Sequence, residues 1–140
     1  MMAASLNDGD AWFDGRASAF ALTRHHDSRG ALTPLALAPL PFPVRRVFTV
    51  AGVPAGTVRG GHGHQRGWQL LVCVSGTLDV RLHYAGQEVR RQLSARGPAL
   101  LIGAGVWAEQ TYVDAHTVLL VACSDDYDPS SYREEKAVQA

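Results

Sequence analysis

Two histidines stand two positions apart in a stretch rich in glycine. Gly60 and Gly61 precede His62, and Gly63 separates it from His64. On a β-strand, side chains at i and i+2 project from the same face, about 7 Å apart. Two imidazoles at that spacing can flank one small molecule or share a metal ion, and imidazole is the commonest acid–base group near neutral pH. We therefore expect this pair to carry chemistry, the alternative being two satisfied polar residues on a strand.

The elements that must position this pair are predicted to be strands. Apolar residues come in short runs bounded by glycine, proline and aspartate, without long helical periodicity. In one of these runs Leu78, Val80 and Leu82 alternate with polar residues, which is the period of a half-buried strand. The predicted strands are residues 46–50, 68–74, 77–84, 87–93, 99–102 and 117–123. This pattern indicates an all-β sandwich or barrel, with the four prolines of residues 31–43 predicting an extended crossing at a sheet edge.

Composition limits the partners and the location. The 140 residues include 13 basic and 13 acidic side chains, so the formal net charge is zero. This balance favours neither nucleic acid nor an anionic membrane surface as a partner, and any anion site must be a local arginine cluster. No apolar run is long enough to predict a transmembrane helix, and residues 1–10 lack the features of a signal peptide. With Cys73 and Cys123 in apolar runs, we expect reduced core thiols and a cytoplasmic protein.

The frame around the histidines resembles the first motif of the cupin superfamily, which implies a single-domain jelly-roll β-barrel. The motif places a glutamate where this chain has Gln69, and a second motif places a third histidine where it has Ala108. Two imidazoles, an amide and a methyl group leave a first-row metal ion poorly coordinated. We therefore expect no metal and no other cofactor. A metal-dependent cupin oxygenase, with Glu109 or His116 as a substitute ligand, is the alternative.

A narrower resemblance covers about residues 24–133. Residues 27–32 (D-x-R-G-x-L), 59–64 (R-G-x-H-x-H), 41–48, 70–76 and 124–128 are similar in order and spacing to the bacterial nucleotide-sugar 3,4-ketoisomerases, which act on dTDP-4-keto-6-deoxyglucose. Gln69 falls where that family also has glutamine. This resemblance divides the chain into an N-terminal extension (1–23), a cupin sugar-isomerase domain (24–133) and a polar C-terminal tail (134–140).

The resemblance implies a reaction that needs neither a metal nor a redox cofactor. A ketone at C4 acidifies the C3 proton, an imidazole removes this proton to give an enediol, and a proton returned at C4 leaves the ketone at C3. His62 is the expected base, and His64 the partner that shuttles or orients the proton.

The same resemblance implies a set of substrate-binding side chains near the mouth of the barrel. Arg59 is expected to stabilise the enediolate or bind phosphate, and Gln69 to bond a sugar hydroxyl or orient a histidine. Arg46 or Arg66 is expected to hold the nucleotide, with an aromatic face that Trp107 could supply if it is not simply part of the core. The expected partner is a dTDP-linked 4-keto-6-deoxy sugar, and the family default is a homodimer, with residues 31–43 as a segment for pairing between subunits.

The sequence departs from the family at three positions. Phe48 and Thr49 stand where tyrosines are usual, and Ala108 stands where a histidine is usual. Three hypotheses stay open: a ketoisomerase that works with the two histidines alone, a related nucleotide-sugar epimerase, and a non-catalytic accessory protein that binds a sugar nucleotide.

Overall fold

The chain folds into two stacked β-sheets. The computed structural model describes residues 9–133, and within them no helix is long and apolar enough to cross a membrane. In spatial order, the strands of the first sheet are β1 (Ala11–Trp12), β2 (Ala17–Phe20), β10 (Ala99–Ile102), β7 (Gln69–Ser75), β12 (Val118–Cys123) and β5 (Arg46–Val50). Those of the second sheet are β13 (Tyr132–Arg133), β6 (Thr57–His64), β11 (Trp107–Tyr112), β8 (Thr77–Tyr84) and β9 (Gln87–Ser94). The prediction of an all-β fold is confirmed.

The core lies between the two sheets, as alternation along the strands requires. Leu78, Val80 and Leu82 of β8 are buried, whereas the polar residues between them are exposed or half-buried. Leu71 of β7 and Val121 of β12 meet them from the first sheet. The six strands predicted from the sequence are all present, with bounds that differ by a residue or so. Cys73 and Cys123 are buried free thiols, as predicted.

The N-terminal residues contribute to this sheet framework. β2 pairs with β10 through Ala17 to Phe20, and Ala17 and Ala19 are almost completely buried. Residues 9–23 of the predicted N-terminal extension are therefore part of the first sheet and its connections, because β2 covers an edge that β10 would otherwise expose. Residues 1–8, and the predicted tail at 134–140, lie outside the described residues.

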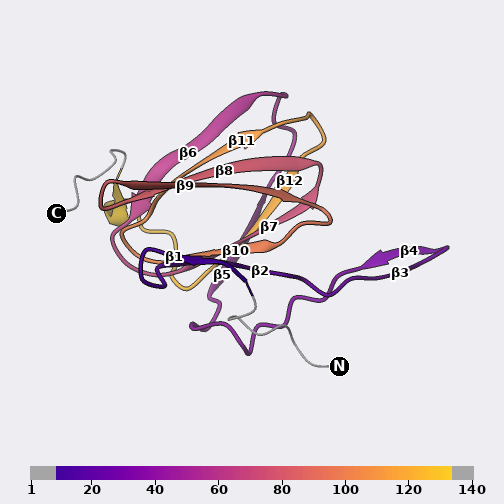
Figure 1. Cartoon of the computed structure of the whole chain (residues 1–140), viewed down its shortest axis with the longest axis horizontal. Coiled ribbons are helices and arrows are strands. Elements are labelled where there is room, and N and C mark those ends of the chain that lie inside the picture. The colour runs from indigo at the N-terminus through magenta and orange to yellow at the C-terminus, as the bar shows by residue number, and fades with distance from the viewer. Residues whose placement is uncertain (1–8, 134–140) are drawn as a thin grey trace.

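The proline-rich segment lies over a sheet face, which corrects the expected crossing at a sheet edge. Leu40 and Phe42 are buried against Leu70 and Val72 on the outer side of the first sheet. Before this segment, β3 (His25–Asp27) and β4 (Gly30–Leu32) form a hairpin that projects away from the two sheets (Figure 1). Every residue of this hairpin's two strands is exposed.

A bulge in β6 sets the direction of the two histidines. Gly60 pairs with Glu109 and His62 with Ala108, so Gly61 is an extra residue without a partner on β11. Gly60 and Gly61 have φ values of 81° and 73°, which glycine adopts at little cost. Without the extra residue, His62 would lie opposite Trp107 and face outward, since a one-residue shift reverses every side chain.

We predict that Gly60→Ala destabilises the fold more than Gly56→Ala does. Both glycines have φ near 80°, at 81° and 82°, so both changes carry the cost of a left-handed alanine, about 1–2 kcal/mol. A Cβ at Gly60 would also lie 2.7 Å from Gln110 Oε1 and 3.1 Å from the Ala108 carbonyl oxygen, whereas nothing lies within 4 Å of one at Gly56. The crowding at Gly60 adds to this cost, because Gln110 must move and the Ala108 carbonyl oxygen must give way slightly. Urea unfolding measures the difference, and equal losses in the two variants would contradict the crowding at Gly60.

Candidate active site

The two histidines form an edge-to-face pair inside the sheet sandwich. Their ring centroids are 5.5 Å apart and their planes are 80° apart. His62 lies opposite Ala108, a core residue, so both imidazoles face the interior of the fold. Both side chains are half-buried. The prediction that the pair shares one strand face is confirmed, and the bulge determines that this face is the inner one.

Two pockets meet at His64. The inner pocket brings both histidines together with Gln69, Ala108 and Gln110. Because Ala108 has only a methyl group, the polar side chains that the described residues contribute to the inner pocket are two imidazoles and two amides, without a carboxylate among them. Gln110 is a residue that the sequence analysis did not single out, although its place two positions after Ala108 on one strand puts it on the same face.

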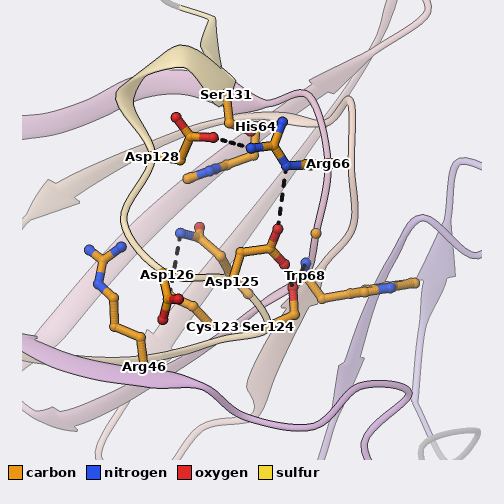
Figure 2. Close-up of a pocket in the computed structure, with 12 residues that line it drawn as sticks. Arg46, His64, Arg66, Trp68, Cys123, Ser124, Asp125, Asp126, Asp128 and Ser131 are labelled. Atoms are coloured by element: carbon orange, nitrogen blue, oxygen red, sulfur yellow. Dashed lines mark hydrogen bonds and ion pairs between the residues drawn. The ribbon is translucent and has the colours of Figure 1, made fainter.

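The outer pocket lies on the other side of His64 and is more highly charged. Its lining includes Arg46 and Arg66 together with Asp125 and Asp128, and Figure 2 shows their side chains gathered around His64. The acidic residues follow β12 and were not among the predicted site residues. Three aspartates within residues 125–128 were the available indication in the sequence.

The environment holds His64 in its neutral form. Burial lowers the pKa of this imidazole from 6.5 to about 4, and repulsion by a protonated His62 and by the Arg46 guanidinium acts in the same direction. The carboxylate of Asp125 opposes them by favouring the protonated ring. At neutral pH, His64 is therefore an uncharged imidazole that can accept a proton.

Gln69 lies at the start of β7, where both pockets reach it. Its Nε2 donates to Cys123 Sγ over 3.9 Å, which is a weak bond because a thiol is a poor acceptor. Burial raises the pKa of the Cys123 thiol, so the sulfur stays protonated and uncharged. The side-chain amide of Gln69, beside His64, is therefore held by a weak bond only, and it adds no charge to the site.

The predicted nucleotide-binding arginines have different surroundings. The guanidinium of Arg46 lies 4.7 Å from the ring centroid of Phe48 on β5 and 5.3 Å from that of the exposed Tyr127. Arg59 is exposed on β6 just before the bulge, opposite Gln110. Neither makes an ion pair with any residue between 9 and 131. Arg66, by contrast, pairs with Asp125 and Asp128.

Trp107 lies on the other face of β11 from Ala108, the residue opposite His62. It alternates with Ala108 on β11 and therefore faces the outer side of the second sheet, where the guanidinium of Arg81 lies 5.2 Å from its ring centroid. The expectation that Trp107 forms an aromatic wall of the site is corrected, because strand alternation points its ring away. Trp68 lines the outer pocket instead and stacks on Phe42 at 6.5 Å.

The donor set at the site does not fit a cupin metal ion. The positions that would supply a carboxylate and a third imidazole are Gln69 and Ala108, and Ala108 faces His62 with a methyl group. Within the described part of the chain, no three His, Cys, Asp or Glu side chains come together in an arrangement that would hold a metal. Two imidazoles without an anionic ligand leave such an ion under-coordinated.

Comparison with known proteins places this geometry among sugar-nucleotide isomerases. A family model described as FdtA: WxcM-like, C-terminal, matches residues 16–138. The TDP-4-oxo-6-deoxy-alpha-D-glucose-3,4-oxoisomerase of Aneurinibacillus thermoaerophilus is 31% identical over 107 residues, which are 76% of this chain and 77% of the relative.

Solved structures agree with this assignment. QdtA, a sugar 3,4-ketoisomerase from Thermoanaerobacterium thermosaccharolyticum solved with TDP, has a TM-score of 0.79 and 30% identity over 86% of this chain and 88% of its own. A point mutant of QdtA was solved with TDP-4-keto-6-deoxyglucose. The RmlC epimerase of Mycobacterium tuberculosis shares the fold, with a TM-score of 0.76 and 21% identity over 94% of this chain and 72% of its own.

These matches confirm the predicted cupin fold and cover the strands that carry both histidines. The family match begins at residue 16, so it includes β2. With most of its residues matched by the family model and a curated relative sharing 31% identity over 76% of its length, this chain belongs to the FdtA family of WxcM-like, C-terminal domains.

Proposed function

We propose that this chain is a metal-independent 3,4-ketoisomerase that moves the ketone of a TDP-linked 4-keto-6-deoxyglucose from C4 to C3. The observation that carries the proposal is the neutral His64 beside His62, in a pocket where amides replace the metal-binding carboxylate. The similar oxoisomerase and the QdtA complexes support the choice of substrate.

The proposed reaction conserves atoms and electrons within the substrate. His62 takes the proton from C3 while the C4 carbonyl oxygen gains one, which gives the enediol. The hydroxyl at C3 then loses its proton as C4 receives one, leaving a ketone at C3 and a hydroxyl at C4. His64, 5.5 Å away between ring centroids, returns or relays the proton. Imidazoles suit these roles because the neutral ring can accept a proton from carbon or oxygen and the protonated ring can donate it again.

Substrate binding is assigned to the side chains around the histidine pair. Gln69 can exchange its weak bond to Cys123 for a sugar oxygen. Arg59 and Arg46 make no ion pair with a described residue, so they are the guanidinium groups that we assign to the diphosphate or the enediolate. Tyr127, exposed beside Arg46, is the aromatic face that we assign to the base in place of Trp107.

We place this reaction in the cytoplasm. Cys73 and Cys123 are both unpaired thiols, as expected in a reducing compartment.

The test of the proposed reaction is proton NMR in heavy water with TDP-4-keto-6-deoxyglucose and chelator-treated protein. We expect the C3 proton signal to disappear while a 3-keto product grows. His62→Asn and His64→Asn should each lower the rate at least 100-fold, because each removes a proton-transfer group. A new stereoisomer with its ketone still at C4 would favour an epimerase. Binding of the sugar nucleotide without exchange would favour the accessory protein.

A neutral His64 also predicts how stability depends on pH. The folded-state pKa is about 4 and the ordinary value is 6.5, so between these values the unfolded chain binds more protons. The free energy of unfolding should therefore fall as the pH decreases from neutral toward about 4.5. In the wild type, this decrease should be on the order of 1 kcal/mol, because partial exposure of His64 reduces the effect. The His64→Asn variant should not show it. Urea unfolding of both proteins at several pH values measures it, and identical slopes would contradict the assignment.

We further propose that the protein is a homodimer and that the β3–β4 hairpin pairs with the second subunit. An isolated two-stranded hairpin is marginal in water, yet this one projects with both strands exposed. Leu32 at its end is 63% exposed, and Val47 on the edge strand β5 is 56% exposed. Both offer apolar surface that a second copy can cover.

Sedimentation velocity tests the dimer. Leu32→Glu should shift the protein toward the monomer, because a carboxylate replaces a side chain that we place in the interface. Val113→Glu, at a 43% exposed position on the main body, is the control and should leave the distribution unchanged. A monomeric wild-type protein would refute the proposal.

A further inference from the structure

The turn that follows His64 is bound to the segment after β12. The Trp68 amide donates to Ser124 Oγ over 2.8 Å, and the Ser124 amide donates to the Trp68 carbonyl oxygen over 3.0 Å. Ser124 Oγ in turn donates to Asp125 Oδ1 over 2.6 Å. Trp68 and Ser124 are 56 residues apart in the sequence, so the two bonds between them fix the turn relative to the end of β12.

Arg66 adds two ion pairs to the same connection. Its Nε lies 3.6 Å from Asp125 Oδ2, and its Nη2 pairs with Asp128 (Figure 2). A Cβ at Gly67 would lie 2.8 Å from both Asp125 Oδ1 and Ser124 Oγ, so only glycine permits this close approach. At the other end of the turn, the Gln65 amide donates to the Ser131 carbonyl oxygen over 2.7 Å.

These contacts argue against Arg66 as a ligand of the substrate diphosphate. Its guanidinium already faces two carboxylates, which would repel a second anion. Arg46 lines the same pocket and makes no ion pair with a described carboxylate. The charge available to a diphosphate in this pocket is therefore that of Arg46.

We propose that Asp125 and Arg66 are positioning residues for His64, which they hold in place by fixing the turn of residues 65–68. This inference rests on the proposed isomerase for its kinetic consequences only, because the pair and its effect on His64 can be measured without turnover.

Electrostatics around His64 supports the assignment. His62 on the same strand and Arg46 from β5 both disfavour its protonated form, and the Cys123 thiol lining the pocket is uncharged. Asp128 is engaged by Ser130 and Arg66, which keep its carboxyl ionised with a lowered pKa. Asp125 is the carboxylate whose charge raises the pKa of His64. Loss of the Asp125 carboxylate should therefore lower the pKa of the His64 imidazole and also leave its position less firmly fixed.

The experiment is a double-mutant cycle with Arg66→Gln and Asp125→Asn in the full-length protein. Each single change should lower kcat about tenfold through misplacement of His64 and leave KM within twofold. The double variant should be no slower than the slower single one, because the two residues act together. The dissociation constant of TDP, measured by calorimetry, should also stay within twofold.

Arg45→Gln is the matched control. Arg45 pairs with Asp126 at 3.2 Å on the same segment, whereas the ion pairs of Arg66 are with Asp125 and Asp128. This variant should keep wild-type kinetics. If Arg66→Gln instead raises KM or the TDP dissociation constant tenfold while Asp125→Asn does not, Arg66 is a phosphate ligand and the proposal is overturned.

A second measurement is independent of activity. NMR titration of the His64 ring, over the pH range where near-ultraviolet circular dichroism stays native, should show a lower pKa in Asp125→Asn than in the wild type. Asp126→Asn should leave the titration unchanged. If the wild-type protein shows no isomerisation, the proposed function fails, and this titration alone then tests the positioning role of Asp125 and Arg66. Equal titration in all three proteins would refute the positioning role.

Discussion

The single extra residue in β6 is the constraint on which the site depends. Because Gly61 has no partner on β11, the strand changes face between Arg59 and His62, and both histidines turn inward. The same shift places Arg59 opposite Gln110 and His62 opposite Ala108, so an arginine three positions from a histidine lies on the same side of the sheet. The backbone at Gly60 and Gly61 is left-handed, and Gln110 and the Ala108 carbonyl oxygen leave no room for a side chain at Gly60.

Sequence patterns predicted the strands and the shared face of the histidines, since both follow from local periodicity. They did not predict that this face is the inner one, because a bulge interrupts the count. Trp107 shows the result: its place in a familiar motif suggested a site residue, whereas its alternation with Ala108 turns it outward. The partners of Arg66 were also missed. They lie about 60 residues away, and only the fold brings their carboxylates to the turn after His64.

The chemistry of the site follows from the uncharged side chains of Gln69 and Ala108 at two positions of the cupin motifs. An amide and a methyl group occupy the positions that hold metal ligands in other cupins, and the two imidazoles lie edge to face with their ring centroids 5.5 Å apart. Burial then keeps His64 uncharged at neutral pH. Among the described residues that line the two pockets, the aspartates and arginines belong to the outer one, where they surround the approach to the same imidazole. This separation suits proton transfer on a substrate that carries its own negative charge at one end.

The cover over the first sheet has a consequence for biosynthesis. β7 contains an uncharged apolar run from Leu70 to Val74, the kind of segment that pairs with other chains when it is exposed. Its neighbours β10 and β12 are translated after it, so a nascent chain carries this strand before its sheet can form. Leu40 and Phe42, which pack on its outer face, are translated before it. The apolar side chains that cover this face of β7 are therefore already synthesised when β7 leaves the ribosome, which is when an uncovered apolar strand is most exposed to aggregation.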